Sequence, residues 1–257
     1  MAVTRATVID GRHTYRPEAL GRVFGWFFLA TFITSIPAFF VGYHDMLNNP
    51  SWITGAGGDP SSGISFGAAS EVLLIVCGVA TAVLAYPVLK RESEIGAVGY
   101  LSGRLVESMF IGIGVIAALS FLLMRQDGTA TSAPFLGSVF DSMYYRAFLV
   151  GPGFITGLTN GVILGYLMYR SELVPRGMTW LGLIGGPAIM ITGILIIYNV
   201  IPRGGAAQSI ATLPEALWEL SLSIYCIIKG FRASSPIFST DAVTRLPDSD
   251  SALRQGL

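Results

Sequence analysis

The chain has 257 residues, of which 52% are hydrophobic and only 12% are charged, whereas an ordinary soluble domain is about 25% charged. So much apolar surface requires a lipid environment, and the balance of 16 basic against 16 acidic residues excludes nucleic acid as a partner, because phosphates select a basic surplus. Cys77 and Cys226 lie in apolar runs without a CxxC motif or a nearby histidine, which argues against a metal site and indicates buried, inert thiols.

Six stretches are long and apolar enough to cross a membrane. A helix needs about 20 mostly apolar residues to span a hydrocarbon core of roughly 30 Å. Apolar and polar residues do not alternate in these stretches, so they are not strands of an outer-membrane barrel. The expected fold class is an all-α integral membrane protein, a six-transmembrane-helix bundle in a lipid bilayer. The predicted spans are residues 20–42, 67–89, 97–124, 149–169, 179–201 and 212–230.

The distribution of lysine and arginine predicts the orientation. Twelve of these residues fall on the N-terminal arm, the second and fourth connections and the tail, while the other side has Arg125 and Arg203, plus Arg146 if the segment before the fourth span lies at the surface. Positive residues accumulate on the cytoplasmic side, so both termini are expected in the cytoplasm.

Three segments follow from this arrangement. Residues 1–19 are a cytoplasmic N-terminal arm that lacks the apolar block of a signal peptide. Residues 20–231 are the six-helix transmembrane domain. Residues 232–257 are rich in serine, aspartate and proline and are predicted to be a disordered cytoplasmic tail.

The fourth span contains a proline and a row of glycines. Because proline is best tolerated in the first helical turn, Pro152 predicts that the span starts near Gly151 and that residues 138–148 lie along the outer surface. Glycines at successive i+4 positions share one helical face and allow close helix packing, either within the monomer or against a partner membrane protein or a second copy. These glycines are Gly153, Gly157, Gly161 and Gly165.

Arg104 and Glu107 are ionisable residues inside the third span. At 1.5 Å per residue from Gly96, Arg104 lies about 12 Å deep and Glu107 about 16 Å deep. The i,i+3 spacing allows the arginine to neutralise the glutamate, although Arg104 could also snorkel to the interface. Asn160 in the fourth span has nearly the same depth. Ionisable groups at mid-membrane usually face the bundle interior, so a polar centre is expected, with a purely structural ion pair as the alternative.

A second group is predicted toward the outer side. Glu71 and Glu219 lie at comparable depths in the second and sixth spans and could face one another, where two close carboxylates cannot both ionise cheaply. His44 and Asp45 could join them, but one histidine on a loop is too little for a metal site.

The start of the last span contains two further polar signals. Residues 212–215, TLPE, match a capping box, which predicts that Glu215 caps the helix start. Trp218 is expected to be an interface anchor.

Several motifs occur in a fixed order. They are AYPVLKRESE at 85–94, GYLSGR at 99–104 with Glu107, GYLMYRSELVPR at 165–176, and Glu215 and Glu219 before IKGF at 228–231. Over residues 17–232 this order resembles a bacterial membrane family, domain of unknown function 4386. The resemblance implies a multi-pass protein of the bacterial plasma membrane and no particular activity.

Three functions are compatible with these features. The first is binding or carrying a small molecule, lipid or ion through Arg104, Glu107, Asn160, Glu71 and Glu219. The second is a non-catalytic accessory or structural subunit of a larger membrane complex. The third, an intramembrane enzyme, is disfavoured because HExxH and GxSxG motifs are absent and the two histidines are expected on opposite sides. The absence of a GxxxxGKS motif also argues against an ATPase. The sequence identifies no cofactor.

Overall fold

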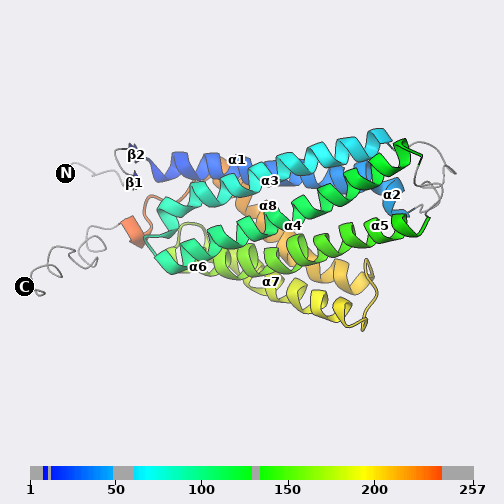
Figure 1. Ribbon diagram of the computed structural model, residues 1–257. Coiled ribbons are helices and arrows are strands. Elements are labelled where there is room, and N and C mark those ends of the chain that lie inside the picture. The colour runs from blue at the N-terminus through cyan, green and yellow to red at the C-terminus, as the bar shows by residue number, and fades with distance from the viewer. Residues whose placement is uncertain (1–7, 11–12, 49–60, 129–133, 239–257) are drawn as a thin grey trace, which may run out of the picture.

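The computed structural model describes residues 8–10, 13–48, 61–128 and 134–238. Within these ranges, six helices are long and apolar enough to cross a membrane, which confirms the expected multi-pass helical bundle. They lie side by side as one elongated bundle (Figure 1). The six candidate spans are Pro17–Gly42, Ser61–Leu89, Glu94–Gln126, Ser142–Ser171, Arg176–Ile197 and Ala206–Lys229.

Several spans are built from more than one element. The first span joins α1 (Pro17–Pro37) and η1 (Ala38–Gly42). The second is α3 (Ser61–Leu89), and the short helix α2 (His44–Asn48) lies between the two spans. The third is α4 (Glu94–Gln126). The fourth joins α5 (Pro134–Phe148), η4 (Leu149–Ile155), η5 (Gly157–Leu164) and α6 (Gly165–Ser171). The last two are α7 (Arg176–Ile197) and α8 (Ala206–Lys229). The short elements are an antiparallel pair, β1 (Val8–Asp10) and β2 (His13–Tyr15), and a 3₁₀ turn, η6 (Pro236–Phe238).

The first and last described elements lie at the same end of the bundle, which we call the β1 end, and α2 and the start of α5 lie at the opposite end (Figure 1). α1 packs between α3 and α8, α4 packs on α3, and α7 packs on α8 and η5. A core of buried apolar side chains, including Phe24, Phe28 and Trp218, joins these helices. Cys226 is buried and Cys77 half-buried, and both are free thiols.

The glycine face of the fourth span packs against α7. A Cβ added to Gly161 would lie 2.5 Å from the Cα of Gly186, and one added to Gly186 would lie 2.3 Å from the carbonyl oxygen of Gly157. Real Cβ atoms do not approach so closely, so only glycine permits this backbone contact. The expected close packing is confirmed, and at Gly157 and Gly161 it occurs within the chain.

The fourth span begins earlier than predicted, so the placement of residues 138–148 on the outer surface is wrong. α5 runs directly into η4, and Tyr144 and Ala147 are buried where α5 packs against α4. Pro152 lies inside η4, a π-helical segment. Proline cannot donate the i→i−4 hydrogen bond, and the chain accommodates it with the wider i→i+5 pattern instead of starting a new helix.

Residues 232–238 are ordered, so the prediction of disorder from residue 232 is wrong for this segment. The backbone N–H of Arg232 donates to the carbonyl of Leu173 at 3.0 Å, and the Ser235 hydroxyl donates to the carbonyl of Ser171. Ile237 is buried. These backbone and apolar contacts order a segment whose composition alone suggests disorder. The remainder of the predicted tail lies outside the described residues.

We expect Gly186→Ala to destabilise the protein by about 1–3 kcal/mol, because the methyl group overpacks the contact with Gly157. The measurement is the apparent thermal unfolding midpoint in detergent. Gly177→Ala is the matched control on the same helix: its Cβ would meet nothing within 4 Å, so no loss is expected. Equal midpoints for the two variants would contradict the packing described here.

Candidate functional site

A half-open cavity of about 130 Å³ extends into the bundle, and all five residues selected from the sequence line it: Glu71, Arg104, Glu107, Asn160 and Glu219. They come from α3, α4, η5 and α8. The outer and inner groups expected from the sequence therefore form one site. The other lining residues are Thr31, Phe32, Ser35, Phe39, Leu74, Ile111, Phe148, Pro152 and Thr156.

Arg104 and Glu107 form a buried ion pair. The Nη1 of Arg104 lies 2.5 Å from Oε2 of Glu107, and the two residues are 4% and 6% exposed. Nε of Arg104 also donates to the carbonyl of Gly78 on α3 at 3.4 Å. The alternative that Arg104 snorkels to the interface is therefore wrong, because its guanidinium finds both partners inside the bundle.

Gly78 makes room for this arginine. A Cβ at residue 78 would lie 2.7 Å from Nη2 of Arg104, closer than a side-chain contact permits. The carbonyl that accepts from Arg104 and the space for its guanidinium thus come from the same residue. Sequence reasoning missed Gly78 because one glycine among many in an apolar span carries no signal of its own.

Asn160 connects η5 to α8 through both its side chain and its backbone. Its Nδ2 donates to Oε1 of Glu219 at 2.5 Å, and its carbonyl accepts from Nε1 of Trp218 at 2.9 Å. Trp218 is fully buried, so its prediction as an interface anchor is wrong. The Oδ1 of Asn160 is also buried and has no hydrogen-bond partner among the described residues.

Glu71 is held by two tyrosines and does not pair with Glu219 as the sequence suggested. Its carboxylate accepts from the Tyr43 hydroxyl at 3.1 Å and from the Tyr144 hydroxyl at 2.8 Å. Burial and the nearby Glu71 carboxylate raise the pKa of Tyr43, so this hydroxyl stays protonated and donates. Tyr144 was missed because the sequence placed α5 outside the bundle.

The other expected members of the outer group do not join the cavity. His44 is exposed and does not line it, while the side chain of Asp45 lies outside the described residues. In the part of the chain that the structure describes, no group of three or more His, Cys, Asp or Glu residues is arranged to hold a metal ion.

Glu215 is a further buried carboxylate. α8 begins at Ala206, so the predicted capping box at Thr212 and Glu215 is wrong: Thr212 lies inside the helix and donates to the carbonyl of Gln208. The Glu215 carboxylate is buried and neither oxygen has a hydrogen-bond partner among the described residues. It lies one helical turn from Glu219. The sequence signal was available, since the apolar pattern of α8 starts before Pro214.

The charges around the cavity are unequal. Three carboxylates, Glu71, Glu107 and Glu219, line it together with one cationic side chain, Arg104. Glu215 adds a fourth carboxylate nearby. Lipid supplies no counter-charge at this depth, and close carboxylates do not all ionise cheaply. The site can therefore hold protons or attract a positively charged ligand.

Comparison with known proteins identifies one family. The family model described as Domain of unknown function (DUF4386) matches residues 23–230, which include every residue of the cavity lining. A search of curated proteins and a search of solved structures find no match.

Replacing Arg104 alone should lower the free energy of unfolding more than replacing both members of the ion pair. We expect Arg104→Gln to lower the free energy of unfolding by about 3–5 kcal/mol, because it leaves Glu107 as a buried, unpaired charge. The double variant Arg104→Gln with Glu107→Gln should recover most of this loss. Unfolding by denaturant in detergent provides the measurement.

Arg170→Gln is the matched control, since its side chain is 59% exposed and only loosely paired with Glu92 at 3.4 Å. Exposed pairs contribute about 0–1 kcal/mol, so a small effect is expected. If Arg104→Gln and Arg170→Gln lower the free energy of unfolding equally, the buried ion pair contributes no more to stability than the exposed pair.

Proposed function

The chain belongs to the family domain of unknown function 4386, and we propose that it binds a small cation in its buried cavity as a multi-pass protein of the bacterial plasma membrane. Both termini are proposed to be cytoplasmic. Lys90, Arg91, Arg170 and Arg176 lie in or beside the turns at the β1 end, and the positive-inside rule supports a cytoplasmic location for that end.

The observation that carries this proposal is the excess of carboxylates around the cavity. Glu107 is neutralised by Arg104 at 2.5 Å. Among the described residues, the hydrogen bonds that Glu71 and Glu219 receive come from neutral groups, two tyrosine hydroxyls and an amide. A monovalent cation in the cavity would offset one of these two negative charges. The unpartnered Oδ1 of Asn160 supplies a further oxygen of the kind that cations accept.

The volume of the cavity limits the ligand. One water occupies about 30 Å³ in the liquid, so a space of about 130 Å³ accommodates only a few non-hydrogen atoms. An inorganic cation with some of its water, or an ammonium ion, fits this size. A lipid or a larger organic molecule would extend beyond this volume.

Salt-dependent stability tests this proposal. The purified full chain is unfolded thermally in chloride salts of sodium, potassium, ammonium and choline at equal ionic strength; choline is the reference because it is too large for the cavity. We expect at least one of the small cations to raise the midpoint above that in choline. A ligand at 100 times its Kd stabilises by about 2.7 kcal/mol.

Substitutions in the cavity lining test whether the cation-dependent shift of the unfolding midpoint arises there. Glu219→Gln and Glu71→Gln should fold and lose the cation-dependent shift, because each removes one negative charge from the cavity lining. Glu92→Gln is the control, since Glu92 lies in the turn between α3 and α4, outside the cavity, and should keep the shift. If no small cation differs from choline, or if all three variants keep the shift, the cavity does not bind a cation.

A density map of the native protein at side-chain resolution checks the same site directly. The expected result is non-protein density beside Glu107, Asn160 and Glu219. A dry ion pair with no further density would contradict the proposal, and a co-purifying membrane protein in that case would favour an accessory subunit.

A further inference from the structure

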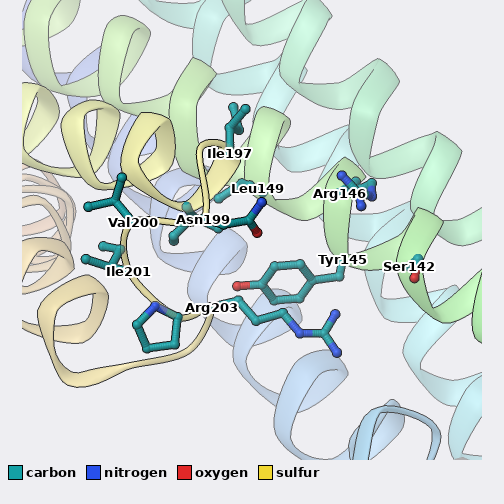
Figure 2. Close-up of a pocket in the computed structure, with 11 residues that line it drawn as sticks. Ser142, Tyr145, Arg146, Leu149, Ile197, Asn199, Val200, Ile201 and Arg203 are labelled. Carbon is teal, nitrogen blue, oxygen red and sulfur yellow. The ribbon is translucent and has the colours of Figure 1, made fainter.

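A larger hollow of about 470 Å³ opens near the end of the bundle opposite β1 (Figure 2). It lies between the start of the fourth span and the turn that joins α7 to α8. None of its lining residues also lines the buried cavity, so the two sites are distinct. We call this hollow the interfacial groove.

The interfacial groove lies at the end of the fifth candidate span, since Ile197, on one wall, is the last residue of that span. Ser142, on the other wall, lies in α5. We take the boundary between hydrocarbon and lipid headgroups to lie near this level. Tyrosine, which has an apolar ring and a polar hydroxyl, is enriched at such boundaries, and Tyr145 lines the groove.

The polar wall of the groove is held by contacts between the fourth span and the α7–α8 turn. The guanidinium carbon of Arg203 lies 4.7 Å from the centre of the Tyr145 ring, and the Tyr145 hydroxyl donates to Oε1 of Gln208 at 3.3 Å. The same oxygen accepts from the backbone N–H of Gly204 at 2.8 Å. Figure 2 shows the Arg203 side chain running along the ring of Tyr145. These contacts position the arginine in the groove.

The lining of the groove is positively charged. Arg146 and Arg203 both line it, and none of its described lining residues is an aspartate or glutamate. Arg146 is exposed, and no ion-pair partner for it is found among the described residues. The planar guanidinium group suits phosphate oxygens, to which it donates two parallel hydrogen bonds.

Apolar side chains adjoin this charge. Ile197 and Val200 line the groove and are 56% and 65% exposed. A free anion would gain nothing from such surface, whereas a molecule with a phosphate and a hydrocarbon chain would contact both parts of the groove. From this combination we propose that the interfacial groove binds an anionic phospholipid, with the headgroup phosphate at Arg146 and Arg203 and an acyl chain along Ile197 and Val200.

Native mass spectrometry of the detergent-purified full chain tests this site. The protein is titrated separately with dioleoylphosphatidylglycerol, dioleoylphosphatidylcholine and inorganic phosphate. We expect the wild-type protein to retain phosphatidylglycerol in preference to phosphatidylcholine. Arg146→Gln should weaken phosphatidylglycerol binding roughly tenfold, the loss expected for one charge-assisted hydrogen bond, and a second substitution, Arg203→Gln, should abolish the preference.

Arg125→Gln is the matched control, because Arg125 lies near the C-terminal end of α4 at the same end of the bundle and does not line the groove. It removes the same charge and should leave binding unchanged. Arg146→Gln alone keeps the test valid if Arg203→Gln fails to fold, since Arg146 is exposed. Equal retention of the two lipids, an unchanged preference in Arg146→Gln, or displacement of phosphatidylglycerol by inorganic phosphate at equal concentration would each overturn the proposal.

Discussion

A charged or polar side chain at mid-membrane must find its partner within the protein, because lipid offers neither hydrogen bonds nor counter-charge. Arg104 meets this constraint with Glu107 on its own helix and the Gly78 carbonyl on α3. Glu71 meets it with the hydroxyls of Tyr43, between η1 and α2, and of Tyr144 on α5, and Glu219 with the amide of Asn160. The helices that surround the cavity are thus fixed relative to one another by the polar groups that they bury.

The sequence was sufficient for the fold class, and it selected five residues that the structure brings to one cavity. Apolar stretches of the right length identify membrane spans with little ambiguity, because the bilayer thickness sets the length. Depth along each span then selected Glu71, Arg104, Glu107, Asn160 and Glu219, and all five line one cavity. Counting residues from the span ends is well founded on α3, α4 and α8, because an α-helix rises by a constant amount per residue.

Pairing and helix starts were harder to predict, for two physical reasons. Depth says nothing about rotation around the helix axis, so the sequence suggested that Glu219 could face Glu71, whereas its carboxylate accepts from Asn160. Local helix-start signals also competed with tertiary packing. Pro152 and the residues before Glu215 look like first turns, yet a π-helical segment and an earlier start of α8 place both inside longer helices. Tyr144 and the buried Glu215 escaped detection for the same reason.

The ordered segment after α8 has a mechanical consequence for the bundle. Arg232 and Ser235 are bonded to the chain between the fourth and fifth spans. A Cβ at Gly230 would lie 2.2 Å from the carbonyl oxygen of Glu18, so the start of α1 and the end of α8 touch backbone to backbone. The helices are therefore clamped together at the β1 end. We therefore expect any motion that widens the cavity to separate the helices at the opposite end, because these contacts hold the β1 end together.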